Sequence, residues 1–122
     1  MVAGKRNRVV LVTCESVTQA RRIANGVVRK RLAACVNIVL SPVQSIYRWK
    51  GKVERAREVL MMIKTSDKRL AKLEKEVKRQ HSYEVAEFIV VPIAGGSREY
   101  LAWLEESVQP AGERAIDRTR QG

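Results

Sequence analysis

The sequence from Leu32 to Thr65 predicts one long β-hairpin, and this hairpin constrains the fold more than any other segment. Its first half is rich in β-branched and aromatic residues, and its second half ends in the apolar run Val59–Ile63. Gly51 lies between the two halves and can adopt the positive φ of a tight turn. Pro42 cannot donate to a strand ladder, which predicts a bulge or break there. The outer part of the hairpin is too apolar to be left in water, so we expect a partner subunit to cover it.

The length of 122 residues suits one domain with a modest core. No stretch reaches the roughly 18–20 apolar residues that span a bilayer, and the basic N-terminus lacks the features of a signal peptide. We therefore expect a cytoplasmic protein without a membrane partner, in which Cys14 and Cys35 stay reduced. The expected organisation is a basic extension over 1–7, a folded domain over 8–108 and a disordered tail over 109–122.

The order of predicted elements indicates an α+β fold. A strand over 8–14 precedes a helix capped by Ser16, and the hairpin leads to a helix that is capped by Ser66 or Asp67 and ends near His81. A strand over 88–93, a turn at 94–96 and a third helix capped by Ser97 follow. The first six elements match the ferredoxin-like split βαβ pattern, with the first and third strands in the middle of the sheet. Helical spacing puts Val28 on the apolar face of the first helix, and the third helix carries Tyr100 with Leu101, Leu104 and Val108.

The chain is strongly basic, with 24 Lys and Arg residues against 13 Asp and Glu residues. Such an excess can indicate a nucleic-acid partner. The basic residues are spread along the chain, however, and acidic residues are interleaved with those of the densest segment, Lys68 to Arg79. A solvated helix face with local ion pairs therefore explains the charges better than a dedicated nucleic-acid surface.

Six motifs in order resemble the CutA family of divalent-cation tolerance proteins. They are LVTC from Leu11, RLAACVNI from Arg31, SIYRWKG from Ser45, the segment from Glu58 to Thr65, HSYEVAE from His81, and YLAW from Tyr100. The resemblance extends over residues 8–108. It implies a ferredoxin-like subunit that forms a homotrimer through the extended hairpin, a response to copper and other divalent cations, an architecture similar to trimeric PII signalling proteins, and no enzymatic activity. The family's His-Pro-Tyr-Glu appears here as His-Ser-Tyr-Glu, and a second proline is replaced by Ala86.

Three residues are candidate ligands for copper, which favours imidazole and thiolate. They are His81, the only histidine, with Cys35 and Cys14. The topology puts Cys14 and His81 at one end of the sheet and Cys35 at the other, so a site using both Cys35 and His81 would need two subunits. The alternatives stay open: the cysteines also fit as core residues, and His81 also fits as a helix C-cap. No spacing encodes a closed zinc cage.

A polar cluster before the last strand is the second candidate site. We expect an intersubunit pocket lined by Trp49, Glu58, Lys64, Tyr83, Glu84 and Glu87. Interface ion pairs explain these charges equally well. No nucleophile, base and orienting group can be recognised together, so we predict no enzyme. The alternative function is a PII-like sensor that binds a small anionic ligand in the clefts and signals to a protein partner.

Overall fold

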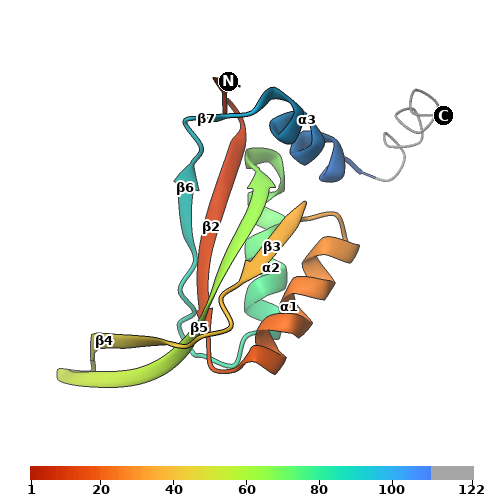
Figure 1. Ribbon diagram of the computed structural model, residues 1–122. Helices are drawn as coiled ribbons and strands as arrows, with labels where there is room; N and C mark the ends of the chain where they lie inside the picture. The colour runs from red at the N-terminus through yellow and green to blue at the C-terminus, as the bar shows by residue number, and fades with distance from the viewer. Residues whose placement is uncertain (111–122) are drawn as a thin grey trace.

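The computed structural model describes residues 1–110, which form a five-stranded sheet with a projecting hairpin, a short two-stranded sheet and three helices (Figure 1). The elements are β1 (Val2–Ala3), β2 (Asn7–Cys14), α1 (Val17–Arg29), β3 (Cys35–Ile38), β4 (Val43–Trp49), β5 (Lys52–Ser66), a 3-10 turn (Asp67–Arg69), α2 (Leu70–Gln80), β6 (Ile89–Pro92), β7 (Gly95–Gly96) and α3 (Arg98–Ser107). The predicted disorder of the tail concerns residues that lie, apart from 109 and 110, outside the described part.

The sheet has the strand order β3-β5-β2-β6, and each pair of neighbours is antiparallel. This order confirms the ferredoxin-like prediction, because the first and third long strands are central and the other two are at the edges. Pro92 lies at the end of the edge strand β6, where a missing N–H does not disrupt the sheet. The segment predicted as a turn at 94–96 differs: Gly95–Gly96 forms the strand β7, which pairs with β1 at the N-terminus.

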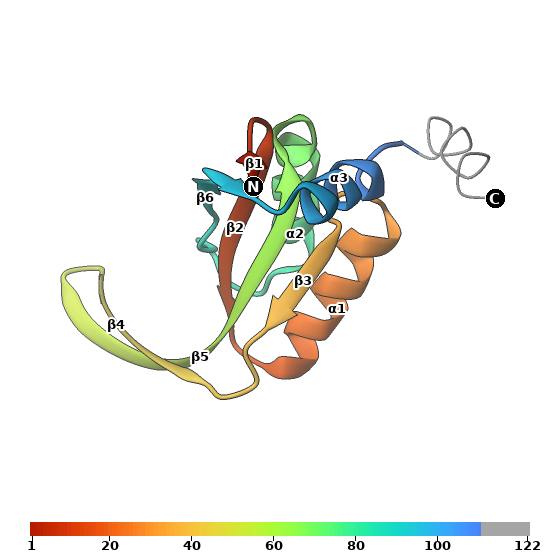
Figure 2. The ribbon, with the colours of Figure 1, turned by 45° about the horizontal axis from the view of Figure 1, so that its top comes forward.

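The hairpin has the predicted turn and the predicted break. Lys50 and Gly51 both have positive φ, 51° and 81°, as in the two-residue turns that suit twisted hairpins. β4 pairs with β5 from Trp49 opposite Lys52 back to Val43 opposite Glu58. Between β3 and β4 the four residues 39–42 lie opposite only two residues of β5, which forms a bulge at Pro42. β4 and the outer half of β5 therefore leave the domain as one curved ribbon (Figure 2).

The core lies between one face of the sheet and the helices α1 and α2 (Figure 1). Alternate residues of β2 and β5 point into it, because successive strand residues face opposite sides. Its fully buried members include Val10, Val12, Met61, Ile63, Ile23, Val27, Leu73 and Val77. The other face carries apolar side chains of intermediate exposure, and β6 exposes 39–49% of Ile89, Val90 and Val91. One sheet face is thus apolar yet poorly covered.

The Ser16 and Ser97 caps are confirmed, whereas Ser66 makes no side-chain cap bond and Asp67 begins the 3-10 turn before α2. The Ser16 and Ser97 hydroxyls accept bonds from the backbone N–H of Gln19 and Tyr100, at 3.1 and 3.0 Å. Val28 is 41% exposed and Tyr100 is 43% exposed. The buried stripe of α1 is therefore narrower than the predicted apolar face and leaves Val28 outside it.

Arg31 joins the end of α1 to the end of α3. Its backbone has a φ of 61°, and the bonds from Leu32 N to Val27 O and from Arg31 N to Val28 O close the helix as a Schellman motif. Its guanidinium donates to the carbonyl oxygens of Gln109, at 2.6 Å, and Glu106, at 3.2 Å. The positive charge of Arg31 beside these carbonyl oxygens stabilises the C-terminal end of α3, where the helix dipole is negative.

Candidate functional site

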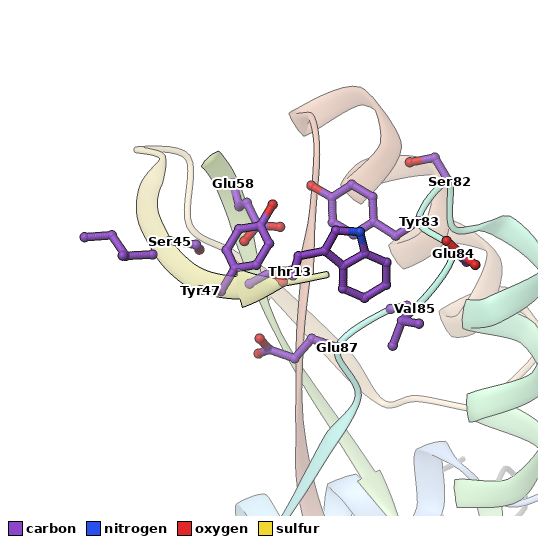
Figure 3. A pocket seen from close by; sticks show the side chains of 12 residues that line it. Thr13, Ser45, Tyr47, Glu58, Ser82, Tyr83, Glu84, Val85 and Glu87 are labelled. Carbon is purple, nitrogen blue, oxygen red and sulfur yellow. The ribbon is translucent and has the colours of Figure 1, made fainter. Parts of the chain in front are cut away.

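A pocket of about 800 Å³ lies where the hairpin leaves the sheet. The hairpin supplies one wall and the loop between α2 and β6 supplies the other (Figure 3). The lining residues are Thr13, Ser45, Ile46, Tyr47, Trp49, Glu58, Ser82, Tyr83, Glu84, Val85, Ala86 and Glu87. The pocket therefore brings together segments that are about 40 residues apart in the chain.

The charges of the lining are all negative. Three carboxylates, those of Glu58, Glu84 and Glu87, line the pocket, and no Lys or Arg does so. Glu58 is 8% exposed. Burial, followed by a hydrogen bond to the Glu58 carboxylate, raises the pKa of Tyr83 well above its usual range. The Tyr83 hydroxyl therefore stays neutral beside the acidic side chains of the pocket.

His81 holds the loop wall against the end of β2. Its Nε2 lies 2.7 Å from the carbonyl oxygen of Thr13, and its Nδ1 accepts a 3.1 Å bond from the Tyr83 N–H. A carbonyl can only accept and an amide N–H can only donate, so the ring is the neutral tautomer with its proton on Nε2. The His81 and Tyr83 rings pack with centroids 4.7 Å apart. Both ring nitrogens are thus engaged within the chain.

The two cysteines lie at opposite ends of the sheet, as the topology predicts. Cys14 is fully buried at the end of β2, where its Sγ lies 3.9 Å from Met61 Sδ. Burial raises the pKa of the Cys14 thiol, which keeps it protonated. Cys35 pairs with Lys64 in the β3–β5 ladder, and its Sγ lies 4.0 Å from Lys64 Nζ. Cys35 and His81 therefore do not meet within one chain.

Five of the six residues expected in the polar pocket line it together: Trp49, Glu58, Tyr83, Glu84 and Glu87. Lys64 is the exception. It lies six residues beyond Glu58 on β5, about 20 Å away at 3.3 Å per residue. The wall residues Thr13, Ser45 and Tyr47 were missed as pocket members, although their positions at the end of β2 and on the hairpin could have indicated them.

The ligands for a divalent cation are incomplete within one described chain. Among residues 1–110, no group of three or more His, Cys, Asp and Glu side chains is arranged to hold a metal ion. The carboxylates of the pocket are suitable in kind for a hard cation, which takes oxygen ligands. The carboxylates thus fit a hard cation in their chemistry, but residues 1–110 of one chain would not complete its coordination.

The fold and pocket define a ferredoxin-like domain with an extended hairpin and an acidic cleft beside it. A sequence profile of the CutA1 divalent ion tolerance protein family matches residues 8–107. The chain belongs to the CutA family.

Relatives are similar over most of this chain. The divalent-cation tolerance protein CutA of Thermus thermophilus is 50% identical over 99 residues, which cover 81% of this chain and 95% of that protein. Mouse protein CutA is 48% identical over 83% of this chain, and the match covers 58% of the mouse protein.

Solved structures of the same family match the fold. A Thermus thermophilus structure, titled as a divalent cation tolerance protein, has a TM-score of 0.82 at 48% identity and covers 84% of this chain and 99% of its own. A structure titled as the periplasmic divalent cation tolerance protein CutA from Archaeoglobus fulgidus has a TM-score of 0.81 at 39% identity, with the same two coverages. In the part that the structure describes, no helix is long and apolar enough to cross a membrane.

Proposed function

We propose that the chain acts in divalent-cation tolerance as a non-enzymatic cytoplasmic homotrimer that binds the cation in its intersubunit clefts. The observation that carries this proposal is the acidic pocket, which has three carboxylates and no basic side chain in its lining. A cation is attracted to such a lining, and the low exposure of Glu58 strengthens the attraction. The names of the relatives, which describe divalent-cation tolerance, support the same function.

The homotrimer is supported by the exposed apolar surface. Large apolar side chains that are 38–66% exposed lie on the hairpin, on the loop and strand at β6, and on α3: Leu40, Ile46, Tyr47, Trp49, Val53, Val85, Ile89, Val90, Val91, Tyr100 and Trp103. Patches of this kind mark interfaces. A second copy against the hairpin would also close the pocket and could add the ligands that one chain lacks. The number of three rests on the family resemblance.

Copper is the metal we propose first, with Cys35, His81 and Cys14 as its candidate ligands. The geometry ranks these residues. Cys35 is partly exposed, whereas Cys14 is buried and His81 is bonded through both ring nitrogens. Copper at Cys35 and a harder cation at the carboxylates are therefore distinct sites within the same proposal.

A small anionic ligand, as in a PII-like sensor, receives less support. An anion in this pocket would face Glu58, Glu84 and Glu87 without a Lys or Arg in the lining. Negative charges at such short range repel it unless a partner copy supplies cations.

Calorimetric titration of the purified protein with Cu²⁺, Mn²⁺ and a phosphate-bearing nucleotide separates these alternatives. We expect cation binding that is weakened at least tenfold by Glu84→Gln combined with Glu87→Gln. Glu99→Gln, an exposed carboxylate on α3, is the matched control and should leave the affinity unchanged. Cys35→Ser tests the copper site separately. Nucleotide binding without cation binding would contradict the proposal, and light scattering that shows a monomer would contradict the trimer.

A further inference from the structure

The outward face of α1 and α2 is strongly basic. Residues 17–34 contain five basic and no acidic residues, and residues 67–81 contain six basic and three acidic residues. The formal net charge of the whole chain is +11. Along the sequence these charges look dispersed. The fold gathers them, because both helices lie on the same face of the sheet (Figure 1).

The two helices lie side by side in opposite directions. The Arg22 guanidinium lies 3.4 Å from the Gln80 carbonyl oxygen at the end of α2, and Lys30 Nζ lies 2.9 Å from the Glu76 carboxylate one turn earlier. The helix axes of such a pair are about 8–10 Å apart. Basic residues on the two helices therefore share one surface.

A stripe of cations runs along this surface on α2 and the turn before it. Lys68, Lys72, Lys75 and Arg79 follow one another at spacings of four, three and four residues, which puts them on one side of a helix. The opposite side carries the buried Leu73 and Val77. On α1, Arg22 and Arg29 are seven residues apart, two helical turns, and both are exposed.

The acidic residues of this layer do not neutralise the stripe. Glu76 lies between the helices and pairs with Lys30 and Arg79, and Glu74 pairs with Lys78 at 3.0 Å. Within residues 1–110, Lys68, Lys72 and Lys75 have no carboxylate within 4.0 Å. These three ammonium groups are exposed and available to an anionic partner.

The same face remains open when the apolar surface is covered. The exposed apolar side chains lie on the hairpin, β6 and α3, and Val28 is the only large one on α1 or α2 within the described chain. Association through the apolar surface would therefore leave the basic face in solvent. In an oligomer, one such face per subunit would be displayed outward.

We propose that the basic face of α1 and α2 binds the phosphate backbone of duplex nucleic acid without sequence preference. The charge complementarity is direct, since duplexes present closely spaced phosphates. Residues 17–34 and 67–81 contain no Trp, Tyr or Phe, so the face offers no stacking platform for unpaired bases. It also lacks the apolar side chains with which a helix inserts into a membrane surface.

Fluorescence anisotropy of a short labelled DNA duplex, titrated with the full-length protein at several salt concentrations, tests the proposal. The wild-type affinity should fall steeply between about 50 and 200 mM salt. The combined variant Lys68→Gln, Lys72→Gln and Lys75→Gln should reduce the slope of log K against log salt by about 2.7, which is about 0.9 for each lost phosphate contact.

The matched control is the combined variant Lys5→Gln, Lys50→Gln and Lys52→Gln. It removes the same charge at exposed positions away from α1 and α2 and should keep the wild-type slope. Equal losses in both variants would overturn the proposal, because binding would then follow net charge alone. The proposal would also be overturned if the protein did not bind the duplex at low salt or bound a single strand more tightly than the duplex. A third contrary outcome is that phosphatidylserine vesicles release all of the duplex from the protein.

Discussion

The Nε2 atom of His81 lies 2.7 Å from the backbone carbonyl oxygen of Thr13, and this bond joins the C-terminal end of α2 to the end of β2. The same ring accepts the Tyr83 N–H through Nδ1. His81 therefore anchors the start of the loop that forms one wall of the pocket. Tyr83, whose ring packs against His81, is positioned by these contacts at the pocket wall.

Replacing His81 by Ala should destabilise the protein by about 1–3 kcal/mol, because two hydrogen bonds near the pocket wall are lost. Chemical denaturation measures this change. Ser82→Ala, at an exposed position of the same loop, is the control and should change stability by less than about 0.5 kcal/mol. If His81→Ala abolished copper binding and left stability unchanged, the ring would be a metal ligand and not a structural tie.

Glu76 should make stability sensitive to acid. Hydrogen bonds from Arg79 and Lys30 lower the pKa of Glu76 to about 2. Because the folded-state pKa lies below the unfolded value of about 4.3, the carboxylate stabilises the fold above that value and loses this effect as pH falls toward 2. Melting temperatures between about pH 5 and 2 should therefore fall less in Glu76→Gln than in the wild type.

The control for this pH dependence is Glu74→Gln. Glu74 pairs with Lys78, but both side chains are largely in solvent, with 45% and 59% exposure. Such pairs contribute little to stability. A Glu74→Gln variant that changed the acid profile as much as Glu76→Gln would contradict the assignment to Glu76.

Two variants of Arg31 separate its backbone role from its side-chain role. Both Arg31→Ala and Arg31→Gly remove the bonds to the carbonyls of Gln109 and Glu106 and should destabilise the protein. Glycine also relieves the positive φ of 61°, so Arg31→Gly should be more stable than Arg31→Ala by about 1 kcal/mol. Thermal unfolding of the two variants gives this difference directly. Equal stabilities would mean that backbone strain at this position is negligible.

The hairpin turn offers a test of its own. Asn tolerates the left-handed region better than Lys, so Lys50→Asn should stabilise the hairpin slightly, whereas Gly51→Ala should cost about 1 kcal/mol. Lys52→Asn, at the first residue of β5, is the control and should not stabilise the protein. Denaturation midpoints report all three changes. A stabilising Gly51→Ala would contradict the observed turn geometry.

The hairpin and the sheet order could be predicted because local signals agreed with the global fold. Gly51 indicated the turn, Pro42 indicated the break, and the order of helices and strands indicated the sheet topology. The pairing of β1 with β7 could not be predicted in this way. Two-residue strands carry no periodicity, and Gly95–Gly96 reads locally as a turn.

The sequence predicted the pocket residues of the loop between α2 and β6, but it did not predict which other residues line the pocket. Glu84, Glu87 and Tyr83 are close in sequence, so they could be grouped without a structure. Lys64 lies on the same strand as Glu58, but a strand spaces six residues over about 20 Å, so Lys64 does not line the pocket of its own chain. The bonding of His81 to Thr13 depends on a tertiary contact, for which the sequence contains no local signal.

The strand β5 runs without interruption from the pocket to the core, so the two cannot change independently in evolution. Glu58 faces the pocket, while Val59 and Ile63 on the same strand are buried in the core. One residue inserted between Val59 and Ile63 would move every side chain on the hairpin side of the insertion to the opposite face of the sheet. Glu58 would then point toward the core and Val59 away from it. Substitutions are therefore accessible along this strand, whereas a change in its length would damage binding and folding together.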